Sequence, residues 1–249
     1  MGKSHKAPPS RGSRSIGQWI IQIIGELLMT MGVILLLFVA WQLWWTNISA
    51  NKTQDQAVSS LAQEFHTTAD PALEQKNWDE KKPPVTAAPA PGDAFGIVYI
   101  PRLGEGYQRP AVEGVGTEVL DTLGLGHYEH TAMPGEVGNF ALAGHRQTNG
   151  AVLDRIDELQ DGDHIYVQTK EGYYTYTVSE AKIVLPTEVN VIAPNPQDPK
   201  KPATERMLTL TSCHPRYGDT ERYIVHATFD NWRPLHAGAP DEIKNVVKS

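Results

Sequence analysis

Cysteine is almost absent from this sequence, with Cys213 as the one cysteine among 249 residues. A single cysteine cannot form an intrachain disulfide, so no disulfide framework supports the fold. Cys213 is therefore either a small buried apolar side chain or a reactive thiol. The number of cysteines alone does not distinguish these two roles.

Metal-binding and phosphate-binding motifs are also missing. The sequence has no His-Glu-x-x-His run, no Cys-x-x-Cys pair and no calcium loop of the EF-hand type. The run Gly114-Val115-Gly116 lacks the later lysine and the strand-to-helix context that phosphate binding requires. We therefore expect neither a metal nor a cofactor.

Basic residues are outnumbered by acidic ones, and they are unevenly placed. The formal net charge of -7 gives no reason to expect nucleic acid as a partner. The chain from Asn47 onward is acidic, with 18 basic and 28 acidic residues. The N-terminal tail is basic instead, because four basic residues precede Glu26, the first acidic one. These four are Lys3, Lys6, Arg11 and Arg14.

One long apolar run separates the basic tail from the rest of the chain. Within residues 19–45, the stretch from Leu27 to Trp45 is interrupted by polar side chains only at Thr30 and Gln42. A helix of about 20 residues crosses the hydrocarbon core of a bilayer. The sequence therefore predicts a transmembrane helix over 19–45, with tryptophans near both ends as interface anchors.

The charge distribution predicts the orientation of this helix. Positive charges stay on the cytoplasmic side, which places residues 1–18 in the cytoplasm and the C-terminal bulk outside the cell membrane. Glu26 is costly within hydrocarbon, but it lies near the cytoplasmic end, where it can reach the headgroups or be protonated. A cleaved signal peptide is the alternative. It requires a shorter apolar core and a small-residue cleavage site, which Ile48-Ser49-Ala50 matches poorly.

Residues 46–93 are expected to form an extracellular stalk and linker. The first part carries apolar residues spaced by three and four, as at Val58, Leu61 and Phe65, which predicts a helix. The last part, 79–93, is rich in proline and alanine and has no apolar periodicity, which predicts an extended spacer. Together, the two parts would hold a following domain away from the membrane.

The pattern changes at Ala94 to short runs rich in β-branched and aromatic residues. The candidate strands are 95–102, 139–144, 163–169, 173–184, 207–213 and 222–230. Residues 152–159 are expected to form one or two helical turns. A string of short strands is typical of a closed barrel or a sandwich. We therefore expect a mostly β domain over 94–232, followed by a C-terminal tail, 233–249.

Cys213 closes one expected strand, and Arg222 opens the next. A thiol nucleophile acts as the thiolate and requires a proton acceptor or a positive charge nearby, together with a group that stabilises an oxyanion. If the two strands pair as a hairpin, their ends lie adjacent and the Arg222 guanidinium could reach both the thiolate and a substrate carbonyl. Arg222 could equally be a surface salt-bridge partner of Asp219 or Glu221.

His145 follows the apolar run 140–143 and is the candidate for proton transfer. Imidazole titrates near neutral pH, so it can hold or release a proton at working pH. As one of nine histidines, His145 could also be an ordinary loop residue. The order along the chain argues against a papain-like protease, in which the cysteine precedes the histidine.

Four segments together resemble the motifs of sortases. They are GHYEHT at 126–131, MPGEVGNFALAGHR at 133–146, LTLTSC at 208–213 and ERYIVHA at 221–227. The similarity covers roughly residues 94–232, and its Thr-Leu-Thr-x-Cys form is most similar to class E sortases of high-GC Gram-positive bacteria. The resemblance implies a closed eight-stranded β-barrel with short helices, anchored by a single N-terminal transmembrane helix.

The resemblance also implies an activity, cysteine transpeptidation. Cys213 would attack the Thr-Gly bond of a short sorting signal and form a thioacyl intermediate. His145 would protonate the leaving amine and activate the incoming one, and Arg222 would steady the substrate and the oxyanion. An amine of the peptidoglycan precursor would then resolve the intermediate and fix a secreted surface protein to the cell wall. Class E enzymes are associated with Leu-Ala-x-Thr-Gly signals in place of Leu-Pro-x-Thr-Gly, a preference that we extend to this chain as a hypothesis.

Five further residues are candidates for the substrate groove. Tyr128 could line the groove and bias the second position of the signal, or it could be a packing residue. Thr211 could contribute a contact near the thiol, or it could be an ordinary strand threonine. Val189, Val191 and Ile192 fall in the connection that forms one wall of the groove in the family. They could hold the leucine of the signal, or they could cap the barrel.

Two other functions remain open. A pilin-polymerising sortase would accept a lysine side chain of another protein, and such enzymes often carry a lid before the barrel. The proline- and alanine-rich segment of this chain lacks the aromatic or acidic anchor expected in a lid. A catalytically silent extracellular binding barrel would instead bury Cys213 and leave its thiol inert.

Overall fold

The computed structural model describes residues 15–67 and 78–247. Most of the predicted cytoplasmic tail and the end of the predicted stalk therefore lie outside the described residues. The chain divides into two compact units between Trp44 and Trp45.

Helix α1 (Ile16–Thr67) begins in the first unit and ends in the second. Its N-terminal part is apolar on all sides, with exposed side chains such as Leu36 and Phe38. Among the described residues it is the one helix long and apolar enough to cross a membrane. The transmembrane segment and the helical stalk, predicted separately, are thus parts of one continuous helix as far as Thr67.

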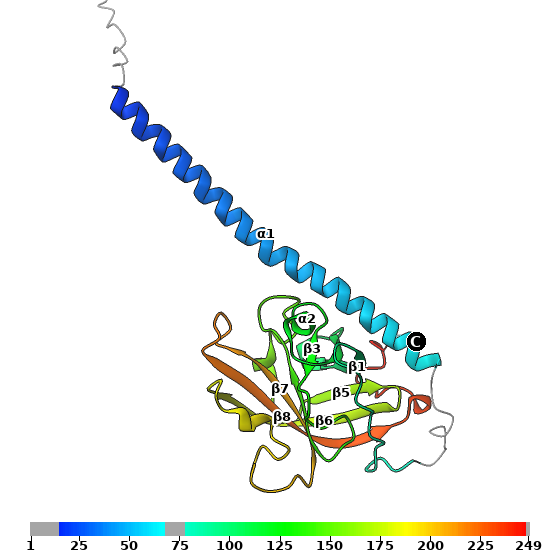
Figure 1. The fold of residues 1–249 in the computed structure, drawn as a ribbon. Coiled ribbons are helices and arrows are strands. Elements are labelled where there is room, and N and C mark those ends of the chain that lie inside the picture. The colour runs from blue at the N-terminus through cyan, green and yellow to red at the C-terminus, as the bar shows by residue number, and fades with distance from the viewer. Residues whose placement is uncertain (1–14, 68–77, 248–249) are drawn as a thin grey trace, which may run out of the picture. The chain divides into compact units, whose positions relative to one another are not determined.

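Eight strands of the second unit close into one barrel (Figure 1). They are β1 (Ala94–Tyr99), β2 (Gln108–Glu113), β3 (Leu125–His127), β4 (Gly138–Ala143), β5 (His164–Thr169), β6 (Gly172–Val184), β7 (Arg206–His214) and β8 (Glu221–Arg233). The order around the barrel is β1-β2-β3-β4-β7-β8-β6-β5. Neighbouring strands are antiparallel except in the pairs β2–β3 and β4–β7. The prediction of a closed eight-stranded barrel is confirmed.

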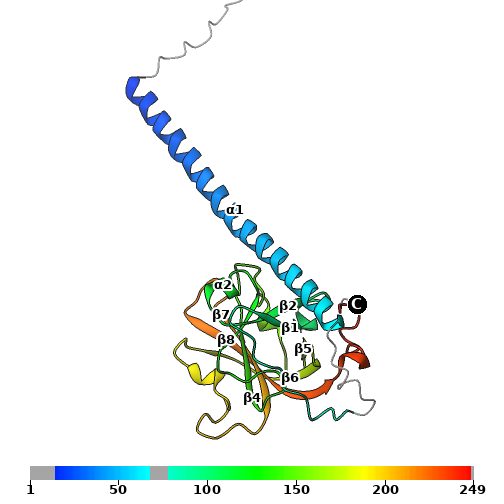
Figure 2. The ribbon, with the colours of Figure 1, turned by 45° about the vertical axis from the view of Figure 1, so that its right-hand side comes forward.

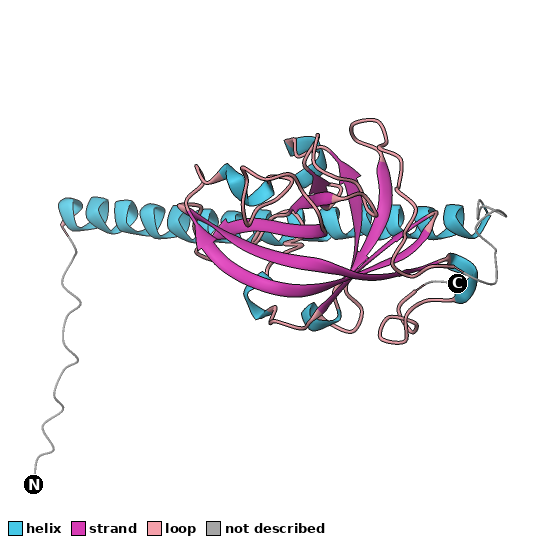
Figure 3. Cartoon of the chain, turned by 90° about the horizontal axis from the view of Figure 1, so that it is seen from below, coloured by secondary structure: helices cyan, strands magenta, loops and turns pink. Residues whose placement is uncertain are grey.

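The helices of this unit other than α1 are short (Figure 3). Helix α2 (Thr117–Leu120) lies between β2 and β3. Short 3₁₀ helices occupy other connections in the described chain. They are η2 (Pro101–Leu103), η3 (Ile156–Glu158), η4 (Val189–Ile192) and η5 (Leu235–Ala237). Of the helical turns predicted over 152–159, the structure forms the single turn η3.

The sequence pattern does not predict two of the strands, β2 and β3. Strand β2 contains Pro110, which has no N–H to donate, and β3 is three residues long with Gly126 at its centre. The strand predicted over 95–102 ends at Tyr99 because Pro101 begins the helix η2. The other five candidate strands are observed, with ends that differ from the predicted ones by at most three residues.

The side chains that point into the barrel form one apolar core. On β7, Leu208 and Leu210 belong to this core, whereas the intervening Thr209 faces outward. Burying one leucine side chain contributes about 1.5–3 kcal/mol to stability. Closure of the barrel also leaves no free strand edge.

The C-terminal part of α1 packs on one outward face of the barrel. Val58, Leu61 and Phe65, at the predicted helical spacing, are buried in a second apolar cluster with side chains of β1, β5 and β6. Those strand residues, which we call the helix-covered face, are Ile97, Tyr99, Tyr166 and Tyr173. Burial disfavours the charged phenolate and raises the pKa of Tyr173 to about 12.

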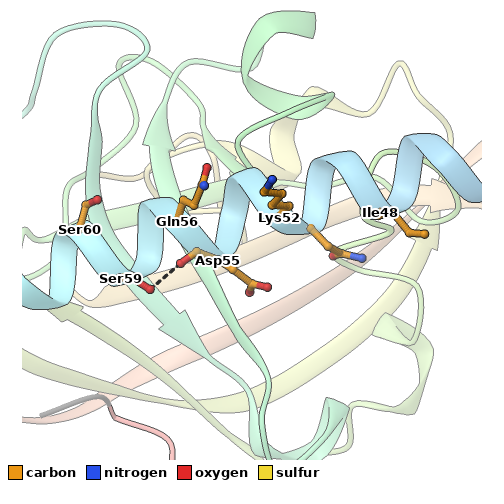
Figure 4. Close-up of a pocket in the computed structure, with 7 residues that line it drawn as sticks. Ile48, Lys52, Asp55, Gln56, Ser59 and Ser60 are labelled. Carbon is orange, nitrogen blue, oxygen red and sulfur yellow. Dashed lines mark hydrogen bonds between the residues drawn. The ribbon is translucent and has the colours of Figure 1, made fainter.

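Another side of the same helical segment is polar and exposed. Lys52, Asp55 and Gln56 are exposed there, and the hydroxyl of Ser59 donates a hydrogen bond of 2.7 Å to the carbonyl of Asp55 (Figure 4). A hollow of about 860 Å³ runs along this side. The described residues that line it all belong to α1 and include neither cysteine nor histidine, so it holds no candidate nucleophile.

The predicted spacer, 79–93, packs on the barrel. The backbone N–H of Thr86 donates to the carbonyl of Pro134 at 3.0 Å. The segment can approach the barrel closely at Gly135, which has a φ of +86° and no Cβ. A Cβ at this position would collide with the carbonyl of Pro84. Proline nitrogens cannot donate, but proline carbonyls accept hydrogen bonds, so a proline-rich composition does not keep this segment off the barrel. The segment predicted to be an extended spacer therefore lies against the barrel.

The predicted C-terminal tail, 233–249, also packs on this unit where it is described. Ile243 is 2% exposed and lies in the cluster beside the helix-covered face. The hydroxyl of Tyr166 donates a hydrogen bond of 2.6 Å to Oε2 of Glu242. The packed domain thus extends beyond 94–232 at both ends.

Candidate active site

Two parallel strands bring the candidate histidine and cysteine to one edge of the barrel. The pairing of β4 with β7 runs to Ala143 and Thr211, and the N–H of Gly144 donates to the carbonyl of Thr211 at 3.1 Å. His145 lies two residues after Ala143, and Cys213 lies two residues after Thr211. Because the two strands run in the same direction, both side chains lie at neighbouring carboxyl ends.

An antiparallel hairpin adds the candidate arginine. In the register of β7 and β8, Cys213 and Arg222 are Cα partners, which confirms the predicted hairpin. Nη1 of Arg222 donates to the backbone carbonyls of Asp219 and Glu221, at 2.7 and 2.8 Å. The guanidinium is therefore oriented by the backbone of its own loop and carries further N–H groups for a ligand.

The three candidate catalytic residues line one cavity of about 230 Å³. Cys213 is partly exposed, so its thiol is not sealed in the core. The structure thus brings His145, Cys213 and Arg222 together with Tyr128 and Thr211. The remaining lining residues are Val115, Leu120, Ala143, Gly144 and Ser212.

Many of the polar side chains near this cavity belong to the outward face of β4, β7 and β8. Alternation along β7 places Thr209, Thr211 and Cys213 on that side, because Leu208 and Leu210 point into the core. The residues that we call the catalytic face are Asn139, Thr209, Thr211, Cys213, Arg222 and His226.

His145 has a partner that no sequence motif indicates. Its Nε2 lies 2.6 Å from Oδ1 of Asp121, the residue that ends α2. Both side chains are partly exposed, at 28% for His145 and 44% for Asp121. Asp121 comes from a different connection of the barrel, so only the fold reveals the pair.

Arg146, next to the candidate histidine, is a second residue missed by the sequence reasoning. It is 2% exposed, and its Nη1 donates to the carbonyl of Cys213 at 3.4 Å and to Nδ1 of His214 at 2.9 Å. Its Nη2 forms an ion pair of 2.8 Å with Asp157, and its guanidinium lies over the ring of Tyr223. Arg146 therefore fixes the backbone around the end of β7.

Tyr128 and Thr211, two candidates for the substrate groove, contact each other. The Tyr128 hydroxyl lies 3.0 Å from Oγ1 of Thr211, and both residues line the cavity. One hydroxyl of this pair is the donor, which leaves the other free to donate to a ligand.

The other three groove candidates lie outside this cavity. Val189, Val191 and Ile192 form η4, in the connection between β6 and β7 coloured yellow in Figure 2. None of them is buried, and Val189 is 68% exposed, so η4 is not a buried cap of the barrel. Asn139 of β4 ties this connection down, because its Nδ2 donates to the carbonyls of Val191 (3.2 Å) and Ala193 (3.1 Å).

A buried polar chain continues from Asn139 across the catalytic face. Thr209 donates to Oδ1 of Asn139 at 2.7 Å, so its hydroxyl oxygen accepts from Nδ1 of His226 at 2.8 Å. Burial and the charge of Lys182 lower the pKa of His226 to about 4. His226 is therefore a neutral structural histidine at neutral pH and not a proton carrier.

The described residues of the site supply a thiol, an imidazole and a guanidinium. No group of three or more His, Cys, Asp or Glu side chains that could hold a metal ion occurs in the described parts of the chain. A thiol beside a proton carrier and a fixed cation is the arrangement that nucleophilic acyl transfer requires.

Comparison with known proteins links this arrangement to one family. The family model described as "Sortase domain" matches residues 98–230, which include both strand ends and the hairpin. The chain is 36% identical over 228 residues to Sortase SrtE1 of Streptomyces coelicolor, covering 88% of this chain. The aligned part spans 60% of the length of that relative. The similarity to class E sortases expected from the motifs is confirmed.

Solved structures show the same fold. The SrtA sortase of Actinomyces oris aligns with a TM-score of 0.64 and 40% identity, covering 68% of this chain and 97% of that one. Sortase E1 of Streptomyces coelicolor, solved with a tripeptide in its active site, aligns with a TM-score of 0.56 and 35% identity. That alignment covers 63% of this chain and 99% of the other.

Proposed function

Since the chain belongs to the sortase family of cysteine transpeptidases, we propose that it cleaves a sorting signal between Thr and Gly. It then transfers the protein that carries the signal to an amine of peptidoglycan. The observation that supports this most directly is the convergence of His145, Cys213 and Arg222 on one cavity. Three separate parts of the chain contribute these side chains, through one parallel and one antiparallel strand pair.

In the first half of the reaction, the thiolate of Cys213 attacks the carbonyl carbon of the signal threonine. A tetrahedral intermediate forms, and its oxyanion is stabilised by donors of the site. When the carbon–nitrogen bond breaks, the imidazolium of His145 gives its proton to the departing glycine amine. The product is a thioester between Cys213 and threonine.

In the second half, an incoming amine attacks the thioester. His145, now neutral, accepts the proton that the amine loses, and the sulfur leaves as thiolate. One amide bond has been broken and another has formed, so no outside energy source is required. The partial exposure of Cys213 is consistent with access for this second substrate.

Arg222 is the residue that we assign to substrate and oxyanion binding. Its position opposite Cys213 in the β7–β8 register supports this assignment, because a permanent positive charge there would lie near a carbonyl that Cys213 attacks. Backbone carbonyls already hold Nη1. The other N–H groups can therefore donate to the oxyanion without reorganising the loop.

The hydroxyl pair of Tyr128 and Thr211 supports a preference at the second position of the signal. The hydroxyl oxygens of this pair can accept a hydrogen bond from the backbone N–H of alanine at this position, whereas proline offers no N–H. We therefore propose Leu-Ala-x-Thr-Gly as the favoured signal. The apolar residues of η4, namely the exposed Val189 and the partly buried Val191 and Ile192, are assigned to the leucine.

The membrane arrangement is also part of the proposal. One apolar helix of the described chain is suited to a single membrane crossing. The basic tail places residues 1–18 in the cytoplasm and the barrel outside, where secreted proteins and peptidoglycan precursors meet.

The pilin-polymerising alternative gains no support from the segment before β1. Residues of that segment contact Pro134 and Tyr174, and the residues that line the cavity of Cys213 all come from 115–222. In the described part of the chain, the thiol is thus not covered by a lid.

The test is mass spectrometry of the purified full chain in detergent micelles. We expect cleavage after threonine in Leu-Ala-x-Thr-Gly peptides and transfer to triglycine, with slower turnover of Leu-Pro-x-Thr-Gly. Cys213→Ala should lower the rate by at least about 10³-fold. Because Cys213 is the one thiol, alkylation with iodoacetamide should abolish activity with a single added mass.

Two results would contradict the proposal. Transfer activity that survives Cys213→Ala would remove the nucleophile, and a thiol that resists alkylation would favour the silent binding barrel. Equal turnover of the two peptides would leave the transpeptidase in place and remove the support for the signal preference.

A further inference from the structure

The contact between His145 and Asp121 determines which ring nitrogen can carry the reacting proton. A carboxylate only accepts hydrogen bonds, so the nitrogen at 2.6 Å from Oδ1 of Asp121, Nε2, bears a hydrogen. Nδ1 of His145 has no hydrogen-bond partner among the described residues. It is therefore the nitrogen available for proton exchange in the cavity.

Asp121 is held in place independently of the histidine. It ends α2, and its backbone N–H donates to the carbonyl of Thr117 at 2.9 Å. Val119, in the same turn, is 1% exposed and anchors the turn in the barrel unit. The backbone of Asp121 is therefore fixed without help from His145, so the carboxylate has a defined position from which to orient the imidazole.

The other charged or titratable groups around His145 come from three further elements. Cys213 extends from β7, Arg222 from β8 and Tyr128 from the connection after β3, and all three line the same cavity. Among the described residues, Asp121 is the one acid in ion-pair contact with His145.

We propose that Asp121 is the positioning residue of the catalytic histidine, an inference that rests on the proposed function. It keeps the Nε2 proton on His145, so that proton exchange runs through Nδ1. In the acylation step, Nδ1–H passes its proton to the departing glycine amine. In the second step, the Nδ1 lone pair takes a proton from the incoming amine, while Nε2–H stays bonded to Asp121 throughout.

A purely structural role would predict a different outcome on substitution. The carboxylate of Asp121 is 44% exposed, and ion pairs with that exposure contribute little to folding. Removing the charge should therefore change the catalytic rate and the tautomer of the ring, with little effect on thermal stability.

The experiment compares Asp121→Asn and Asp121→Glu with the wild type, using the full chain in detergent. We expect kcat of Asp121→Asn to fall about 10- to 100-fold, with KM within about twofold of wild type. Asp121→Glu, which retains a carboxylate, should recover part of the loss. Glu118→Gln is the matched control, because it removes one charge from the same turn without touching His145.

The tautomer is measured separately from activity, by ring ¹⁵N shifts of labelled histidine in the inactive Cys213→Ala background. The His145 signal is assigned by its absence in His145→Gln. We expect the Nε2–H form in the parent and a mixture of both tautomers in Asp121→Asn.

Two results would overturn the inference: a kcat of Asp121→Asn within twofold of wild type, or an unchanged tautomer accompanied by a lower melting temperature. If Cys213→Ala itself remained active, the proposed function would fail, and the tautomer result would still report on the contact.

Discussion

Two faces on the outside of the same barrel differ in the chemistry of the side chains they carry. The helix-covered face on β1, β5 and β6 consists of Ile97, Tyr99, Tyr166 and Tyr173, buried together with side chains of α1. The catalytic face on β4, β7 and β8 carries threonines, an asparagine, two ionisable side chains and the thiol. Both faces arise from the same strand alternation, which sends every second side chain outward.

The difference assigns separate tasks to the two faces. An outward apolar face stabilises the fold only when another element removes it from water, and α1 does this through Val58, Leu61 and Phe65. The catalytic face carries polar side chains instead, most of them buried, and its Cys213 stays partly exposed. Substitutions on the two faces should therefore affect different measured quantities.

The largest effect is expected on the helix-covered face. Phe65 is 2% exposed, so Phe65→Ala should lower the free energy of unfolding by about 3–5 kcal/mol. Denaturation of the full chain in micelles, followed by tryptophan fluorescence, measures this change. Gln56→Ala, on the exposed side of the same helix, is the control and should change little. If Phe65→Ala instead lowered kcat per folded molecule without lowering stability, the result would contradict the proposal that the helix-covered face serves stability and the catalytic face serves activity.

On the catalytic face, Arg222→Lys should lower kcat/KM by about 10²-fold without altering stability. Lysine keeps the charge but loses the planar fork that donates to both loop carbonyls and, in the proposed mechanism, to the substrate. Steady-state kinetics with the preferred peptide gives the answer. Activity within twofold of wild type would remove Arg222 from its assigned role.

His226 offers a pH test on the same face. Its folded-state pKa of about 4 lies below the unfolded value of 6.5, so between these values the unfolded chain binds a proton that the folded chain does not. Stability should therefore fall as the pH drops from about 6.5 to 4, by at most about 3 kcal/mol from this group. Unfolding curves at several pH values give the free energy of unfolding as a function of pH. This free energy should change less steeply with pH for His226→Gln than for wild type. Identical slopes would mean that burial does not hold this histidine neutral.

The smallest effect concerns the Tyr128–Thr211 hydrogen bond. Tyr128→Phe and Thr211→Val should each weaken discrimination between the alanine and proline peptides, and the double variant should lose little more than either alone. A coupling of about 1 kcal/mol in kcat/KM is expected from one neutral hydrogen bond. Additive losses would show that the two hydroxyls act independently.

The contrast between the faces also explains what the sequence could predict. His145, Cys213 and Arg222 lie in recognisable local motifs at strand ends, and they converge because β7 pairs with both β4 and β8. Asp121 belongs to no motif. Its contact with His145 could not be predicted from the sequence, because it depends on how the turn α2 packs on the barrel.

The helix-covered face was predictable only in part. The spacing of Val58, Leu61 and Phe65 predicts a helix with one apolar side, which is observed. Periodicity does not say what that side will contact, so the sequence leaves open whether the stalk helix packs against the barrel. Composition is limited in the same way for the proline-rich segment. It reports the missing N–H groups, but not that Thr86 donates to the carbonyl of Pro134 or that the carbonyl of Pro84 accepts from Tyr174.

The parallel pairing of β4 with β7 has a consequence for folding. Two parallel neighbours cannot be joined by a tight turn, and here the chain builds β5 and β6 between them. His145 and Cys213 are therefore brought together by one of the least local pairings in the domain, and contacts of high sequence separation form slowly. During refolding, we expect peptide-cleaving activity to return later than the change in tryptophan fluorescence that accompanies collapse. The return of activity would then report the closure of the barrel.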